Sequence, residues 1–307
     1  MKSLITTLCL ATVLFTQAQN SIDLLTISGR YGFPQAYDAP FQNEKATETG
    51  AMINLKIPIK LSEKSIWFSN FTYTNYSVNK NFAVASEDAV MKPIGLNAFI
   101  LQTGLVQRID ENRAFQLLFV PRFMTDFVAP TGKSWQFGGI ALYEQTFNQN
   151  LTMRFGAMYN QELAGPFVVP LIDINWKISS RWSITGLAPI YLKVNYKVSE
   201  RFVCGFSHFG LVTSYYLTDP NYLGDYMERT SIDLGLFGRW KMLGNWHLEG
   251  RIGYALGRNY EQYAADEKID FRISIIKIGD HRGPPKNVAF GDGPIASLRL
   301  VYSLPLP

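Results

Sequence analysis

The stretch NWHLEGRIGYALG, residues 245–257, decides the fold class. Its apolar residues recur at every second position, and three ionisable residues fall on the opposite parity. Such alternation predicts a β-strand, because successive side chains of a strand point to opposite faces. In a soluble sandwich the apolar face would pack into a core. In a membrane barrel it would face lipid and the charges would line a lumen. The ionisable residues are His247, Glu249 and Arg251.

The same period of two recurs along the chain. It is clear in GAMINLKIPIKL (50–61), NLTMRFGAMYN (150–160), LIDINWKI (171–178) and SIDLGLFGRWK (231–241). None of these stretches has helical spacing. The pattern therefore predicts an all-β protein.

Turn signals divide the chain into about fourteen strands. Short polar turns, as at 62–64 and 199–201, alternate with longer excursions, as at 33–49 and 258–293. This rhythm is typical of an up-and-down antiparallel transmembrane barrel with short periplasmic turns and longer extracellular loops. Two segments, 181–187 and 190–198, are short, so twelve strands stays open. We predict strands near 22–32, 50–61, 65–77, 94–108, 113–127, 134–148, 151–162, 167–178, 181–187, 190–198, 201–217, 230–242, 245–257 and 294–304.

Composition fits a barrel better than a soluble sandwich. The chain is 14% aromatic and 18% charged, and its mean hydropathy is −0.02, as expected when lipid-facing and lumen-facing residues cancel. Many aromatic residues fall near predicted strand ends, where a membrane barrel carries its girdles. The predicted strands also exceed the five or so residues common in sandwiches. A soluble secreted β-protein is the least favoured alternative.

The first residues, MKSLITTLCLATVLFTQAQN, predict a signal peptide over 1–18 with cleavage after Ala18. The apolar run is shorter than the roughly 20 residues of a membrane-spanning helix. Cleavage would leave Cys204 as the remaining cysteine, which excludes an intrachain disulfide framework. We expect residues 19–307 to form a single domain, because no linker or charge block divides them.

With these features the sequence resembles Gram-negative outer-membrane β-barrel proteins, more narrowly a barrel family of unknown function. The resemblance covers roughly residues 20–307 and includes the closing strand GPIASLRLVYSLPLP. It implies passage to the periplasm and insertion by the barrel-assembly machinery, with outer-membrane lipid around the barrel. Such proteins usually end on an aromatic residue, whereas this chain places Tyr302 before a short tail.

The inward parity of the predicted strands carries nine basic and five acidic residues. A basic, water-filled lumen would concentrate anions, because low-dielectric walls focus the field. Alternatively, the charges pair across the lumen and fill it. We predict these lumen-lining charged groups: Lys56, Arg122, Asp126, Glu144, Arg154, Asp173, Lys177, Lys193, Lys197, Asp233, Arg239, His247, Glu249, Arg251 and Arg299.

The sequence offers no catalytic or metal site. Ser207 and His208 are adjacent in a strand and would point to opposite faces, so they cannot form a nucleophile–base pair. An outer-membrane lipid hydrolase remains the minor enzymatic alternative. The loop 258–293 is the most site-like segment, and RISII (272–276) could form an added extracellular strand. Its candidate residues are Asp280, His281, Arg282, Lys286 and Asp292.

These features predict a passive channel or binding protein for small solutes, anionic ones among them. The main alternative is a non-conducting structural or adhesive barrel whose lumen is closed by paired charges. A fatty-acid-type transporter is a third option, although no N-terminal segment is long enough for an internal plug. We expect no cofactor and no nucleic-acid partner, and the sequence leaves the oligomeric state open.

Overall fold

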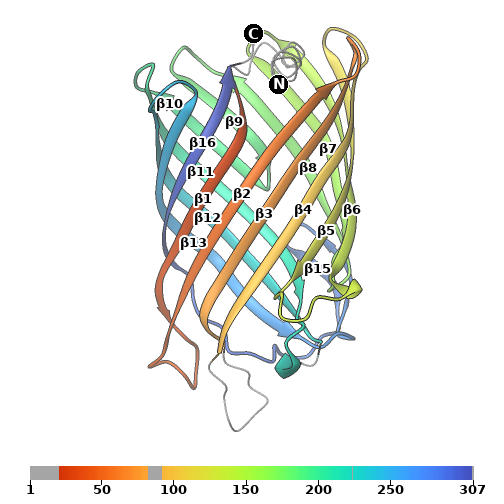
Figure 1. Ribbon diagram of the computed structural model, residues 1–307, viewed down its shortest axis with the longest axis vertical. Coiled ribbons are helices and arrows are strands. Elements are labelled where there is room, and N and C mark those ends of the chain that lie inside the picture. The colour runs from red at the N-terminus through yellow and green to blue at the C-terminus, as the bar shows by residue number, and fades with distance from the viewer. Residues whose placement is uncertain (1–20, 82–91, 223, 306–307) are drawn as a thin grey trace, which may run out of the picture.

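The computed structural model describes residues 21–81, 92–222 and 224–305, and within them fourteen strands close into an antiparallel barrel (Figure 1). Each strand pairs with the next along the chain, and β16 pairs with β1 from Ser21↔Pro305 to Gly32↔Ile295. The predicted signal peptide lies outside the described residues. No helix among the described residues is long and apolar enough to cross a membrane.

The strands are longer than the sequence predicted at several loop ends. The first eight are β1 (Ser21–Ala36), β2 (Lys45–Lys60), β3 (Ser65–Asn81), β4 (Lys92–Arg108), β5 (Arg113–Thr125), β6 (Trp135–Asn148), β7 (Leu151–Gln161) and β8 (Pro166–Lys177). The others are β9 (Trp182–Ala188), β10 (Tyr191–Lys197), β11 (Phe202–Tyr216), β12 (Tyr226–Lys241), β13 (Trp246–Tyr263), β14 (Ile269–Ile273), β15 (Ile276–Asp280) and β16 (Gly293–Pro305). Two 3-10 turns, η2 (Gly132–Ser134) and η3 (Pro220–Tyr222), lie in connections.

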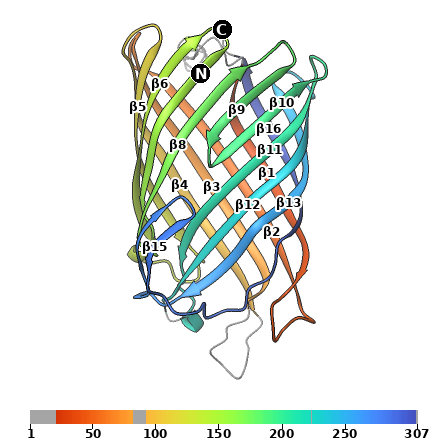
Figure 2. The same ribbon diagram turned by 180° about the vertical axis from the view of Figure 1, so that it is seen from behind.

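Short turns gather at one rim of the barrel and long connections at the other (Figures 1 and 2). We call these ends the short-turn rim and the long-loop rim. Ser21 and Pro305 pair at the short-turn rim, as an even number of strands requires. The alternation of connections predicted from the sequence is thus confirmed, and fourteen strands replaces the alternative of twelve.

The opening stretch lies in β13 with its apolar side chains outward. Ile252 is 69% exposed, whereas Glu249 is 1% exposed inside the barrel. Aromatic pairs mark the short-turn rim, with Trp182 against Tyr196 at 4.8 Å and Trp246 against Tyr302 at 5.1 Å between ring centroids. Rings with an apolar body and a polar tip prefer the membrane interface. The chain is therefore a transmembrane β-barrel.

The interior of the long-loop half is filled by side chains. One apolar cluster lies under the long-loop rim and mixes strand residues with connection residues. Its members are Tyr37, Ala46, Tyr76, Val78, Ile94, Leu96, Ala98, Met124, Tyr215, Leu217, Tyr222, Met227, Tyr260, Val288 and Phe290. We call this cluster the mouth plug.

The loop 258–293 is more ordered than the sequence predicted. Strand β13 continues through it to Tyr263, and β14 and β15 form a hairpin near the long-loop rim (Figure 2). Residues 272–276 are therefore the tip of a hairpin and not one added strand. Strand β14 pairs in parallel with β8, at Arg272↔Phe167 and Ile273↔Val168.

Candidate functional site

The short-turn half of the lumen holds most of the predicted charged residues. They lie on the inner faces of nine strands, because alternation sends every second side chain inward. We call the set the lumenal cluster; it consists of Asp23, Lys56, Glu144, Arg154, Asp173, Lys193, Arg239, Glu249, Arg251 and Arg299, from β1, β2, β6, β7, β8, β10, β12, β13 and β16.

Glu249 is the most buried carboxylate of this cluster. Lys193 Nζ lies 2.7 Å from Glu249 Oε2, and Arg299 Nη1 lies 2.8 Å from Glu249 Oε1. The Lys193 ammonium also stands 4.6 Å from the ring centroid of Phe237. One carboxylate thus holds two cations, Arg299 from the neighbouring strand β16 and Lys193 from β10, which is not paired with β13.

Two further pairs lie on opposite sides of the lumen. Arg154 Nη2 is 2.6 Å from Asp173 Oδ2 on the neighbouring strand, and Arg239 Nη2 is 2.7 Å from Asp23 Oδ1. The sequence analysis missed Asp23, because the β1–β16 register shifts between Asp23 and Leu25 and the bulge breaks strict alternation. An acidic residue at the start of a strand was the available signal.

Two cations of the cluster have no carboxylate partner. Across the described chain, the Lys56 ammonium makes no hydrogen bond or ion pair, and Asp23, Arg299, Arg154 and Asp173 act on it electrostatically. Arg251 Nη2 donates to the backbone oxygen of Asp233 at 2.6 Å, and its Nε has no partner. These two groups leave positive charge available inside the barrel.

The other predicted lumen residues of the short-turn half lie toward the rim. His247 is half-buried, and its Nδ1 lies 3.1 Å from the backbone oxygen of Asn245. Lys197 pairs with Glu200 at 2.6 Å, and Lys177 is exposed. They stand at the entrance and not in the lumenal cluster.

Arg122, Asp126 and Asp233 were predicted to line the lumen, whether open or filled by paired charges, and in the structure they have close protein partners. Arg122 is 5% exposed and pairs with Glu162 at 2.8 Å. Asp126 follows β5 and accepts hydrogen bonds from the backbone of Thr218 and Asp219, both at 2.9 Å. All three residues lie in the long-loop half, which side chains fill, so they face protein and not solvent.

Asp233 belongs to a buried charge network beneath the mouth plug. Glu48, which is fully buried, accepts from Arg30 and from Arg229 Nη2 at 3.0 Å, and Arg258 Nη1 lies 3.7 Å away. Arg30 Nε also donates to Asp233 at 2.9 Å. We call these five residues the Glu48 network. Sequence parity missed Arg258, because a register shift beside Gly257, whose φ is +56°, reverses the alternation there.

The loop candidates do not gather into one site. Arg282 Nε donates to Asp280 at 2.8 Å, and this hydrogen bond holds the pKa of the Asp280 carboxyl below its usual range. Lys286 pairs with Asp225 at 2.8 Å. Asp292 accepts from the Arg258 backbone at 2.9 Å, and His281 lies 3.5 Å from Asp270. The described residues contain no cluster of three or more metal-ligating side chains.

The Ser207–His208 pair is arranged as the sequence predicted. Ser207 is buried on the inner face and lies 3.2 Å from the backbone oxygen of Gly235, to which its hydroxyl donates. His208 has the opposite parity and is half-buried on the outer face. This geometry gives the serine no histidine base.

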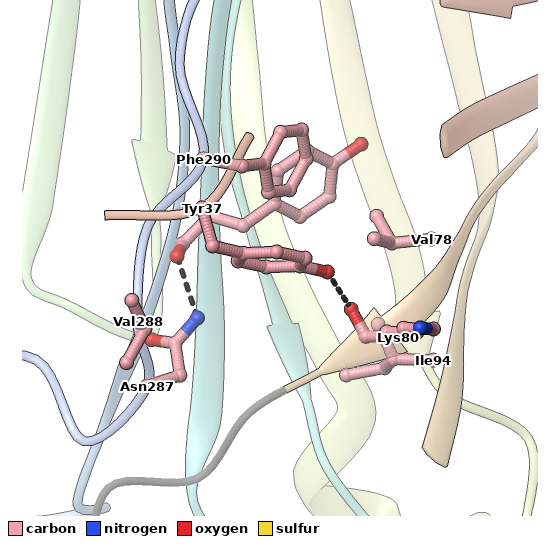
Figure 3. A pocket seen from close by; sticks show the side chains of 8 residues that line it. Tyr37, Val78, Lys80, Ile94, Asn287, Val288 and Phe290 are labelled. Atoms are coloured by element: carbon pink, nitrogen blue, oxygen red, sulfur yellow. Dashed lines mark hydrogen bonds between the residues drawn. The ribbon is translucent and has the colours of Figure 1, made fainter. Parts of the chain in front are cut away.

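Loop residues close the mouth of the barrel. Figure 3 shows Phe290 beside Tyr37, at 5.7 Å between ring centroids, around a cavity of about 10 Å³. The Tyr37 hydroxyl donates to the backbone oxygen of Lys80, and Asn287 Nδ2 donates to that of Tyr260 at 2.8 Å. A cavity of this size holds about one water molecule. Among the described residues, side chains from the loops and strands therefore pack closely at this part of the long-loop mouth.

Residues 15–270 match the family described as Domain of unknown function (DUF6268). No curated protein matches the chain. Among solved structures, the COG4313 outer membrane channel from Pseudomonas putida F1 is 10% identical, with 92% of this chain and 96% of that chain covered and a TM-score of 0.44. The translocator domain of autotransporter NalP from Neisseria meningitidis is 12% identical, with coverages of 91% and 88% and a TM-score of 0.35. At these scores the likenesses carry no argument about function.

Proposed function

The chain belongs to the DUF6268 family, and for this chain we propose an outer-membrane channel that passes or binds small anionic solutes. The observation that carries the proposal is that two lumen cations of the described chain, Lys56 and Arg251, form no ion pair with a carboxylate. In this proposal the signal peptide is cleaved near Ala18, the barrel-assembly machinery inserts the barrel, and the short-turn rim faces the periplasm.

Charge in the lumenal cluster favours anions. The cluster holds six cations and four carboxylates, so its net charge is +2 when every group is ionised. Lys56 and Arg251 both interact electrostatically with Arg299, while Asp23 and Asp173 act on Lys56 and Asp233 and Glu249 act on Arg251. Low-dielectric walls focus such a field and raise the local concentration of anions.

A second candidate is a non-conducting barrel with a structural or adhesive role. It is favoured by the mouth plug and by the pairing of Glu249, Asp173 and Asp23 with lumen cations. Paired charges that fill a lumen act as a polar core and leave no conducting path. Both candidates agree on architecture and differ in whether the mouth opens.

Conductance of the refolded protein in a planar bilayer under a KCl gradient tests the proposal. We expect stable openings with an anion-selective reversal potential, and the double variant Lys56→Gln/Arg251→Gln should move that potential toward zero. Lys64→Gln is the control, because it removes one exposed charge in a short turn.

Unchanged selectivity in the double variant would refute the assignment of the anion site to Lys56 and Arg251. A correctly folded barrel that never conducts, even after Phe290→Ala loosens the mouth plug, would refute the channel and support the second candidate. Heat-modifiable gel migration verifies folding in every case.

A further inference from the structure

The barrel wall is interrupted beside the β9–β10 hairpin. Both strands of this hairpin have seven residues, whereas β8 has twelve and β11 has fifteen. Pairing of β8 with β9 begins at Ile172, and pairing of β11 with β10 stops at Phe209. In the long-loop half, β9 and β10 therefore do not lie between residues 166–171 and 210–216 (Figure 2). Strand β14 pairs with this edge of β8 at Phe167 and Val168.

Strand β11 bends across the barrel above this hairpin. Its Tyr216 pairs with Thr125 of β5, a strand that is not its neighbour in the wall. The outward side chains Val212 and Ser214 consequently pack against the inner face of β5–β8. An apolar layer fills the space between them and continues to the inner faces of β3 and β4. Its members are Leu118, Val120, Ile140, Leu142, Met158, Phe167, Val169 and Leu171, with Phe68, Ile100, Leu187, Ile190 and Val212 against them.

Side-chain hydrogen bonds hold the seam between β11 and the β7–β8 connection. Glu162 Oε2 accepts from the Ser214 hydroxyl at 2.6 Å and from its backbone at 3.1 Å. Leu163 N donates to Ser214 Oγ at 2.9 Å, and Gln136 Nε2 donates to the Ser214 backbone oxygen at 2.7 Å. A barrel wall normally satisfies its backbone through a continuous ladder. A few discrete bonds part more readily than a ladder.

Unpartnered polar atoms border the apolar layer. Asn160 is fully buried, and neither its Oδ1 nor its Nδ2 has a partner. Gln136 Oε1, Arg122 Nε and Ser134 Oγ are likewise buried without partners. Arg122 pairs with Gln136 in register, and Asn160 packs over Gly138 two residues further along β6. Leaving such an atom without a hydrogen bond is unfavourable, so native proteins retain few of them.

We propose that the apolar layer is a binding site for a single-chain amphiphile with an uncharged hydroxyl, ester or amide head. The head would bind to Asn160, Gln136 and Ser134, which together offer both donors and acceptors. Arg122 is neutralised by Glu162, so the site has no net charge to attract a carboxylate. The tail would lie between β11 and β5–β8 after the seam at Ser214 parts. This site is separate from the lumenal cluster and does not depend on the channel proposal.

Photo-crosslinking of the full-length protein in phospholipid vesicles tests the site. The probe is a medium-chain monoacylglycerol with a diazirine in its tail, and a fatty acid of the same chain and diazirine is the comparison. We expect saturable labelling of peptides that contain Met158, Val169 or Val212. Asn160→Leu should reduce this labelling about tenfold, the effect of one or two lost hydrogen bonds. Asn175→Leu, on the inner face of β8 in the short-turn half, is the matched control.

Three results would overturn the proposal. Labelling confined to the outer face and not saturable would mean an ordinary lipid annulus. Unchanged labelling of the Asn160→Leu variant would mean that the Asn160 amide binds only water. Equal labelling by the fatty acid would refute the uncharged head. Ser134→Ala, for which we expect a smaller loss of labelling, replaces Asn160→Leu if that variant does not fold. Conductance is recorded in a separate experiment, because it tests the channel proposal and not the binding site.

Discussion

Removing the charge of Glu48 should destabilise the barrel strongly. Glu48 is fully buried, Arg229 and Arg258 have side chains 1% exposed, and Arg30 completes the set around one carboxylate. Glu48→Gln preserves the shape of the side chain but removes its negative charge. The three guanidinium groups of the Glu48 network then have one remaining carboxylate, Asp233. Breaking a buried ion pair by removing one partner costs about 3–5 kcal/mol. We expect the free energy of unfolding to fall by that amount.

Urea unfolding in phospholipid vesicles, followed by heat-modifiable migration and tryptophan fluorescence, measures this difference. Glu44→Gln is the control, because Glu44 is a partly exposed carboxylate that pairs with Lys80 near the long-loop rim. Exposed pairs contribute about 0–1 kcal/mol. A Glu48→Gln variant no less stable than Glu44→Gln would refute the view that the Glu48 network is a desolvated charge cluster.

Two further predictions concern the long-loop rim. Phe290→Ala removes a ring that is 5% exposed and stacks on Tyr260 at 5.4 Å between ring centroids. Such a truncation costs about 3 kcal/mol, which would raise the open-to-closed ratio of the mouth about a hundredfold. The measurement is the single-channel open probability, which should rise. Phe147→Ala, which removes a ring 55% exposed, should change nothing. The pKa of Asp280 is lowered by its hydrogen bonds from Arg282, so their stabilisation is complete above the ordinary carboxyl pKa of about 3.9 and is lost as pH falls through the lower folded value. Amide exchange of β14–β15 should therefore accelerate in strong acid in the native protein, and Asp280→Asn should abolish that pH dependence.

Local alternation was enough to predict most of the wall. In β13 the apolar residues up to Leu256 face outward and Glu249 faces inward, as the period of two requires. The rule failed where the backbone departs from a regular strand. Bulges next to Leu24 and Gly257 brought Asp23 and Arg258 inside, and a simple count of parity cannot detect an extra residue.

The filling of the long-loop half was not visible in the sequence. Segments 65–77 and 94–108 are apolar on both faces, and the reason is that Tyr76, Ile94 and Leu96 belong to the mouth plug. A residue such as Arg122 has the same parity and type as a lumen-lining arginine such as Arg154. Its different surroundings depend on β11, which crosses the barrel from a distant part of the chain.

The sequence by itself determined the all-β barrel class, the outward apolar face, the rhythm of short and long connections and the inward direction of the lumen charges. All of these follow from local periodicity and turn chemistry, which neighbouring residues specify. Only the tertiary structure decided which charges pair, that the mouth is closed and that an apolar layer lies between β11 and β5–β8. These features arise from contacts between residues far apart in the chain, such as Lys193 with Glu249, and alternation carries no information about them.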